Sequence, residues 1–296
     1  MHQLKAVAYR GAKINQLSNY IDRNSINIDF RLGQSWTIFD DIGRKIKEKI
    51  EISGIHLGKL KIKMCRGILT GYNDAFIIDS VGRVKILDKC SSDTERTKTA
   101  SIMRPVLRGR NINRGSYNWG GEYLIVTHNG YTTEDGDHIA PVDINEYPAL
   151  KKHLDIYFEQ LSTRTDKGKT PYNLRNCAYM EDFQKSKIIW KMISSTPSFA
   201  YTDEDILILN TSFMMTGDVS TGLADILNSK LIEWYFSEIA TSIGETGMLY
   251  IKSSVENIPI QYNIENRRYS EDEIFKLYGL NNDEISYILD SLSNNC

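Results

Sequence analysis

Hydrophobic residues recur at helical spacing in three long segments of the chain. Ile42, Ile46 and Ile50 are four residues apart among lysines and arginines, which predicts a basic amphipathic helix. The same periodicity predicts a helix over about 145–162 and a strongly apolar helix over about 223–235. Each of these helices is expected to bury one face and leave the other in solvent.

Two short helices are expected near the end of the sequence. Ser270 and Glu273 have the spacing of a capping box, in which each side chain accepts a hydrogen bond from the other residue's backbone. Asn281 and Glu284 repeat this arrangement a few residues later.

Short apolar runs rich in β-branched and aromatic residues separate the helices and predict strands. They alternate with the helices without a regular βαβ rhythm, which favours an α+β fold over a doubly wound one. The predicted strands are Ala75–Ile78, Val84–Leu87, Tyr123–Thr127, Ile188–Ile193 and Ile206–Ile208.

Charge is distributed unevenly along the 296 residues, although the net charge is only −2. Residues 60–120 hold 12 Lys and Arg against 5 Asp and Glu, whereas residues 192–296 hold 5 against 16. A basic first two-thirds followed by an acidic last third is a hint of contact with nucleic acid. The alternative is that both charged surfaces are simply solvated.

The sequence lacks the signals that mark several classes of protein. No apolar run is long enough for a membrane span, and the first residues do not form a secretory signal. The four cysteines, at 65, 90, 177 and 296, are too far apart for a CxxC metal site or a compact disulfide framework. Phosphate loops, nucleophile elbows and zinc hydrolase motifs are absent, as is the Asn-Pro-Pro-aromatic tetrad of amino-methylating enzymes.

One acidic and histidine-containing segment suggests an alternative function, that of a metal-dependent nuclease. His128, Asp135, Asp137 and His138 lie within eleven residues of each other, but their spacing matches no ligand template and also suits a polar turn. The 17 tyrosines leave open a further alternative, a platform for carbohydrate or peptide.

Three segments have compositions suited to binding DNA. Residues 65–78 place two glycines and an asparagine in a tight loop before an apolar run. Residues 104–112 carry three arginines, whose forked donors suit phosphate oxygens and guanine edges. Residues 164–175 form a basic, polar loop after a predicted helix.

Taken in order, these segments and several others resemble the TaqI-like C-terminal specificity domain of restriction-modification enzymes, over roughly residues 35–290. The stretches that carry the resemblance include RGI-x-TGYN-x-AFIID, RPVLRGR-x-I, THNG, YPALKKHL, DKGKTPYNLRNCAY, KIIWKMIS, LNSKLIEWYF, VENIPI and KLYGLNNDEI.

The resemblance implies a mixed-sheet target recognition domain with peripheral helices and a helical C-terminal segment. It implies a sequence-reading part of a cytoplasmic bacterial type IIG enzyme or adenine-N6 DNA methyltransferase, with no catalytic activity or cofactor of its own. The expected partners are double-stranded DNA and a catalytic domain of the same polypeptide, which would bind S-adenosylmethionine. The expected division is a linker or cut end at 1–35, a DNA-recognition domain at 36–195 and a mainly helical part at 196–296 that shares its core.

Specific residues can be nominated within this interpretation, because phosphate contacts set the register while contacts to base edges read sequence. Arginine and asparagine offer bidentate matches to guanine and adenine respectively. The candidates for base reading are Arg110, Asn111, Asn113, Arg114 and Tyr117. The candidates for phosphate contact are Arg104, Arg108, Lys167, Lys169, Arg175, Lys185 and Lys187.

Structural roles remain open for some of these residues. Arg104 and Arg175 could instead form ion pairs within the protein. Gly67, Thr70, Gly71 and Asn73 could form a structural corner, since glycine suits turns with positive φ. The acidic helices over about 223–291 could pack against the catalytic domain or face away from DNA.

Overall fold

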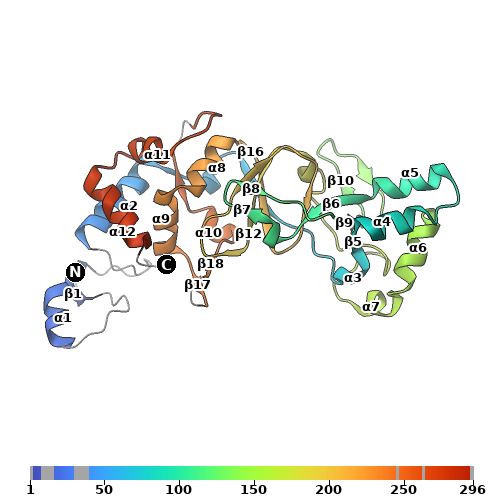
Figure 1. The fold of residues 1–296 in the computed structure, drawn as a ribbon, viewed down its shortest axis with the longest axis horizontal. Coiled ribbons are helices and arrows are strands. Elements are labelled where there is room, and N and C mark those ends of the chain that lie inside the picture. The colour runs from blue at the N-terminus through green and yellow to red at the C-terminus, as the bar shows by residue number, and fades with distance from the viewer. Residues whose placement is uncertain (1–2, 8–16, 30–39, 245–246, 262–263, 294–296) are drawn as a thin grey trace.

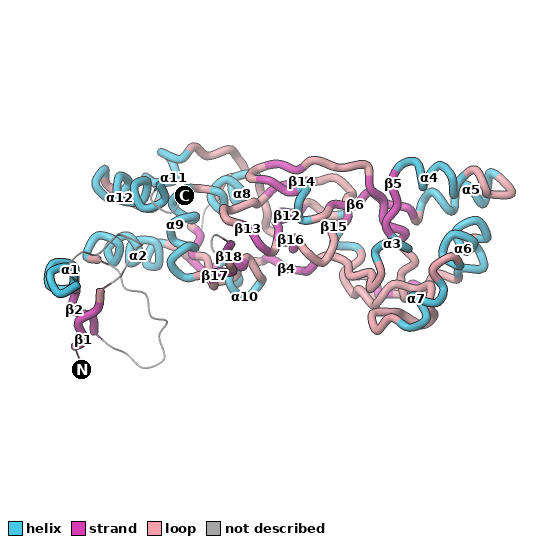
Figure 2. The backbone as a smooth tube through the Cα atoms, turned by 60° about the horizontal axis from the view of Figure 1, so that its bottom comes forward, coloured by secondary structure: helices cyan, strands magenta, loops and turns pink. Residues whose placement is uncertain are grey.

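The computed structural model describes residues 3–7, 17–29, 40–244, 247–261 and 264–293. The molecule is elongated (Figure 1). Helices α2, α9, α11 and α12 gather at one end and α4–α7 at the other, with most of the strands between them (Figure 2).

The helices and strands are short, as expected for a fold with many turns. The helices are α1 (Leu17–Asn24), α2 (Asp41–Ser53), α3 (Asn73–Phe76), α4 (Ser80–Leu87), α5 (Asp93–Ser101), α6 (Pro148–Asp155), α7 (Phe158–Thr163), α8 (Thr221–Asn228), α9 (Lys230–Ile239), α10 (Lys252–Val255), α11 (Glu271–Leu277) and α12 (Asn282–Ser293). The strands are β1 (Gln3–Ala6), β2 (Ile26–Asp29), β3 (Ile55–His56), β4 (Ile62–Arg66), β5 (Ile77–Asp79), β6 (Met103–Leu107), β7 (Ile112–Asn113), β8 (Ser116–Tyr117), β9 (Glu122–Ile125), β10 (Tyr131–Thr132), β11 (His138–Ile139), β12 (Lys187–Lys191), β13 (Ile193–Ser194), β14 (Ala200–Thr202), β15 (Leu207–Ile208), β16 (Ser212–Gly217), β17 (Ser242–Ile243), β18 (Gly247–Leu249) and β19 (Pro259–Ile260).

A central antiparallel sheet, in the order β14-β12-β16-β4, separates two hydrophobic cores. Successive side chains of a strand point to opposite faces of its sheet. On β12, Ile188 and Trp190 therefore enter the core that contains α2, α9 and α12, whereas Ile189 enters the other core. On β16, Met214 and Met215 divide in the same way. The sheet thus contributes one face to each core.

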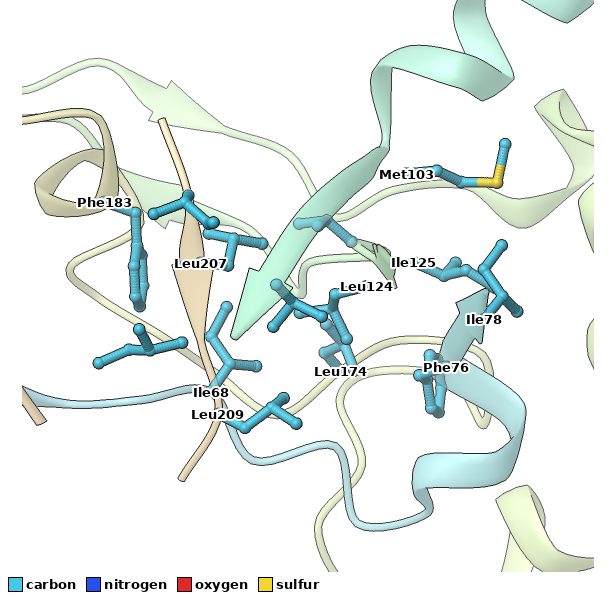
Figure 3. Close-up of a cluster of buried hydrophobic side chains, with 14 of the residues drawn as sticks. Ile68, Phe76, Ile78, Met103, Leu124, Ile125, Leu174, Phe183, Leu207 and Leu209 are labelled. Atoms are coloured by element: carbon cyan, nitrogen blue, oxygen red, sulfur yellow. The ribbon is translucent and has the colours of Figure 1, made fainter. Parts of the chain in front are cut away.

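A second sheet, in the order β15-β6-β9-β5, lies within the other core. The pairing of β15 with β6 is parallel and its other pairings are antiparallel, so the sheet is mixed. Figure 3 shows Leu207 of β15, Leu124 of β9 and Phe76 of α3 among the buried side chains of this core. The expected α+β, mixed-sheet architecture with peripheral helices and a helical C-terminal segment is confirmed.

The capping signals near the end of the chain predicted the helices correctly. Ser270 accepts from the backbone of Glu273 at 3.3 Å, and Glu273 accepts from the backbone of Ser270 at 2.8 Å, at the start of α11. Asn281 and Glu284 exchange the same pair of hydrogen bonds at the start of α12, at 2.9 and 3.0 Å. Both boxes were predictable because they depend only on neighbouring residues.

Two of the predicted helices are divided in two. The expected helix over 145–162 becomes α6 and α7, and Leu154 of α6 and Leu161 of α7 enter the same core. The expected helix over 223–235 is interrupted at Ser229, whose hydroxyl accepts from the backbone of Ile232 at 3.2 Å and so begins α9. A second cap within one periodic segment starts a new helix.

The prediction of a strand at Val84–Leu87 was wrong, because these residues end helix α4. Asp79 caps this helix by accepting from the backbone of Gly82 at 2.6 Å. The predicted strand at Ala75–Ile78 was correct only in part, because α3 continues to Phe76 and β5 begins at Ile77.

Strands from both sides of residue 195 belong to the same sheets, since β12 pairs with β14 and β16, and β6 pairs with β15. Within residues 1–35, β1 and β2 pair as an antiparallel ribbon that flanks α1. Among the described residues, no helix is long and apolar enough to span a membrane.

Candidate nucleic-acid interface

A cleft of about 430 Å³ opens where β6, β12 and β15 end. Three hydrogen bonds hold its walls together: Leu209 N donates to Leu107 O at 3.0 Å, Met192 N to Thr211 O at 2.9 Å, and Gly109 N to Thr211 Oγ1 at 3.2 Å. The cleft is lined by Asn73 and by residues 108–110, 191–193 and 209–211.

Cationic side chains surround this cleft. Arg108 forms a forked ion pair with Glu122, with Nε and a terminal nitrogen 2.8–3.0 Å from the two carboxylate oxygens. Arg110 lies at a looser 3.7 Å from the same carboxylate, and 72% of its side chain is exposed. Arg66 donates to Asn210 O in the 209–211 turn at 2.8 Å, and Lys191 also lines the cleft. Arg110 therefore has most of its donors available to a ligand.

The basic loop at 164–175 is attached to the protein by one buried arginine. Arg164 donates to the backbone carbonyls of Thr70, Pro171 and Asn173, the last at 2.6 Å, and its guanidinium lies 4.6 Å from the ring centre of Phe76. Buried arginines are uncommon unless their donors are satisfied. Arg164 thus links this loop to the loop that precedes α3.

The cations nominated in the basic loop face solvent. Lys167 and Lys169 are exposed, and Lys167 donates to Ser162 O at 2.5 Å. Arg175 is 60% exposed and lies 3.2 Å from Asp166, an ion pair loose enough to yield to a phosphate. These three residues remain candidates for phosphate contact.

The loop with the RGI-x-TGYN sequence is a tightly packed corner beside the cleft. Gly71 has a φ of 71°, a conformation that favours glycine, and a Cβ on Gly67 would lie 2.2 Å from the carbonyl oxygen of Leu209. Thr70 is buried and its hydroxyl bonds to the Asn73 side chain at 2.7 Å. Backbone conformation at Gly71 and close packing at Gly67 therefore explain the two glycines. Asn73 also lines the cleft.

The nominated base readers lie on the hairpin β7–β8 and the turn before it. Asn113 is exposed. Asn111 accepts from the backbone of Arg108 at 2.8 Å, and Tyr117 bonds to Thr202 at 2.9 Å. Arg114 donates to Asn228 O at 2.7 Å and to Glu233 at 2.5 Å, which attaches the hairpin to α8 and α9.

Lys187 does not belong to a phosphate-binding surface in this structure. Its side chain is completely buried, and its ammonium donates to the backbone carbonyls of Phe183, Lys185 and Glu204 at 2.6–3.3 Å. Burial lowers the pKa of this ammonium to about 8. An ammonium with three N–H groups and three carbonyl partners has no donor left for a phosphate. Lys187 is therefore no longer a candidate for phosphate contact.

Arg104 and Lys185 are engaged by carboxylates. Arg104 pairs with Asp205, and only 16% of its side chain is exposed. Lys185 pairs with Glu134 and, at 3.0 Å, with the buried Asp182. Arg104 therefore forms an ion pair within the protein, which was the alternative to phosphate contact.

The histidine and aspartate cluster does not assemble into a metal site in the part of the chain that the structure describes. No three His, Cys, Asp or Glu residues come together there in a way that could hold a metal ion. His128 is half-buried, burial lowers its pKa, and its Nδ1 accepts from the backbone of Gly130 at 3.2 Å. The geometry of the described residues therefore gives no support to the nuclease interpretation through His128, Asp137 and His138.

Three residues of the site were missed from sequence: Arg66, Lys191 and Glu122. Lys191 ends the apolar KIIWK run, so its position at a strand end was a usable signal. Glu122 gave no signal, because its pairing with Arg108 joins β9 to the turn after β6 and appears only in the fold.

A comparison with protein families identifies the family to which this chain belongs. The model for the TaqI-like C-terminal specificity domain matches residues 104–260, which is more than half of the chain. The matched region includes the 108–110, 191–193 and 209–211 walls of the cleft. This chain belongs to the TaqI-like C-terminal specificity domain family.

Solved structures with the same fold come from restriction enzymes. The type IIL restriction-modification enzyme MmeI, solved in complex with DNA, has a TM-score of 0.53 and 12% sequence identity over 79% of this chain. The type IIG restriction endonuclease BpuSI has a TM-score of 0.51 and 15% identity over 86% of this chain. The chain spans only 35% and 32% of their lengths. The search of curated proteins returned no match.

Proposed function

We propose that this chain reads DNA sequence for a restriction-modification enzyme, and that its DNA-facing surface is the cleft together with the basic loop at 164–175. The observation that carries the proposal is a cleft rimmed by exposed cations in a chain of the TaqI-like specificity family. The finer part of the proposal is that the parent enzyme methylates adenine at N6. A catalytic domain of the same polypeptide would bind S-adenosylmethionine and carry out that transfer.

The exposed cations divide into two groups by position. Arg110 projects from the cleft rim, where a guanidinium can form two hydrogen bonds to the edge of a guanine. Lys167, Lys169 and Arg175 lie on the neighbouring loop, where they would contact phosphates and fix the position of the duplex. The acidic helices α11 and α12 lie at the far end of the molecule, as expected if that end does not contact DNA (Figure 1).

The first test is the binding of duplex DNA as a function of salt, measured by fluorescence anisotropy. A sequence-binding protein that neutralises several phosphates loses affinity steeply as salt rises. Duplexes enriched from a random pool give the preferred sequence. If the chain binds no duplex even at low salt, the proposal fails for the isolated chain.

The second test separates base reading from phosphate binding. Arg110→Ala should cost about 1–3 kcal/mol on the preferred sequence and relax preference at one position. Lys167→Ala should weaken all sequences alike and reduce the slope of log affinity against log salt by about 1. Lys276→Ala, an exposed cation on α11, is the charge-matched control and should change neither quantity. Equal losses for Arg110→Ala on preferred and random DNA would exclude it as a base reader.

A further inference from the structure

Trp119 is an exposed aromatic residue beside the cleft. It lies in the connection between β8 and β9, with 41% of its surface exposed, whereas Trp190 and Trp234 are almost completely buried. Burying the ring in the protein would normally be favourable, since tryptophan has a large apolar area. Unlike Trp190 and Trp234, Trp119 is therefore accessible to a ligand.

The exposed part of Trp119 is apolar. Its indole N–H donates to the backbone carbonyl of Glu122 at 2.8 Å, so its one polar group already has a partner. The ring meets the Tyr123 ring edge to face, with centroids 5.2 Å apart, and this contact holds its orientation. The guanidinium of Arg83 also lies against the Tyr123 ring, 4.8 Å from its centre. The indole is thus held as a fixed platform with accessible carbon surface.

Glu122 connects this platform to the arginines of the cleft. Its backbone carbonyl holds the indole of Trp119, while its carboxylate pairs with Arg108 and lies 3.7 Å from Arg110. The connection is also attached to the arginine turn, because Asn118 N donates to Asn111 O at 2.9 Å. Trp119 and Arg110 therefore extend from one rigid group of residues.

We propose that Trp119 stacks on the face of a DNA base that has lost a stacking neighbour, while Arg110 contacts the base edge of an adjoining nucleotide. Every base has a π face, and an aromatic side chain among cations is the usual platform for an unstacked base. A docking protein of the same enzyme is the competing occupant, but the arginines beside Trp119 complement a polyanion. This inference rests on the proposed function and adds the unstacking of one base to it.

The test uses the full chain and duplexes enriched by the wild-type protein, so that only contacts to DNA are measured. Binding should quench the tryptophan emission of the wild-type protein, and the quenching should be lost in Trp119→Phe, which retains the other three tryptophans. Trp119→Ala should weaken binding about tenfold, in line with stacking of one base, whereas Trp119→Phe should retain most of the affinity. Trp119→Leu is the control, because it is apolar but has no π face.

A set of duplexes with a single mismatched pair at each position supplies a readout that a structural role would not change. At one position the mismatch should tighten binding to wild type, because unstacking a mispaired base costs less. Trp119→Ala should lose this preference while melting at nearly the same temperature.

The outcomes separate the proposed reading of DNA sequence from the proposed stacking of Trp119. If wild type selects no duplex, the proposed function fails. If wild type selects DNA but Trp119→Leu binds as well as Trp119→Phe, or no mismatch tightens binding, stacking is refuted and sequence reading remains.

Discussion

Lys187 lies on β12 with its whole side chain buried, and the carbonyl oxygens around its ammonium come from two segments of the chain. Burial lowers the pKa of this ammonium to about 8, whereas a lysine in an unfolded chain titrates near about 10.4. Between these pH values the unfolded chain retains a proton that the folded protein has released. Stability should therefore rise with pH in this interval, because the unfolded state binds more protons.

The prediction is that wild type gains stability relative to Lys187→Met as pH rises from 7 to 10. Below pH 8 the folded protein carries the full cost of a buried charge, and that cost diminishes as the ammonium deprotonates. All other titrating groups are common to both proteins, so the difference in unfolding free energy isolates this residue. Chemical denaturation at several pH values measures it, and two parallel stability curves would contradict the prediction.

Lys187 also shows why exposure was hard to predict from sequence. Its alternation with Lys185 and Lys191 is typical of a strand with one cationic edge, and the strand is indeed present. The pattern cannot show that the 203–205 turn covers this edge, because that turn lies 17 residues further along the chain.

At the scale of elements, the basic loop at 164–175 and the loop that precedes α3 are held together by Arg164. Its guanidinium satisfies three backbone carbonyls from two loops. We predict that Arg164→Met lowers the unfolding free energy by about 2 kcal/mol or more, since it leaves buried acceptors without donors. Arg175→Met is the control on the same loop, and its exposed ion pair predicts a change within about 1 kcal/mol.

Thermal denaturation and DNA titration of the same variants separate a role in holding the basic loop from a role in contacting DNA. Arg164→Met should lower both melting temperature and DNA affinity, because the basic loop loses its attachment. Arg175→Met should weaken binding without a comparable change in melting temperature. Equal melting temperatures for the two variants would mean that Arg164 does not hold the loop.

At this scale, the sequence predicted correctly the features that depend on residues close together in the chain, and it did not predict those that depend on distant residues. The boxes that begin α11 and α12 consist of residues three apart, and they were predicted correctly. Helix α4 was mistaken for a strand because Val84, Ile86 and Leu87 are β-branched or apolar, and its cap at Asp79 lies outside that run. The family motifs indicated the loops of the candidate site, whereas the pairing of Arg114 with Glu233 spans 119 residues and required the fold.

At the scale of the whole molecule, the central sheet joins two cores that would otherwise be separate. Neighbouring residues Ile188 and Ile189 are both fully buried, yet they point into opposite cores. If the sheet couples the cores, a cavity on either face should destabilise the whole molecule. Ile188→Ala and Ile189→Ala should each cost about 2–5 kcal/mol and leave a single unfolding transition.

Hydrogen exchange distinguishes this coupling from two independent halves. In the coupled case each variant lowers the protection of the slowest amides in both α6 and α12 by the same free energy, because those amides exchange through global unfolding. In the independent case Ile188→Ala would affect only the α12 end, since Ile188 packs in that core, and Ile189→Ala only the α6 end. Coupling matters for DNA reading, because the cleft walls at 108–110 and 191–193 extend from strands of different sheets and keep their spacing only while both sheets are folded.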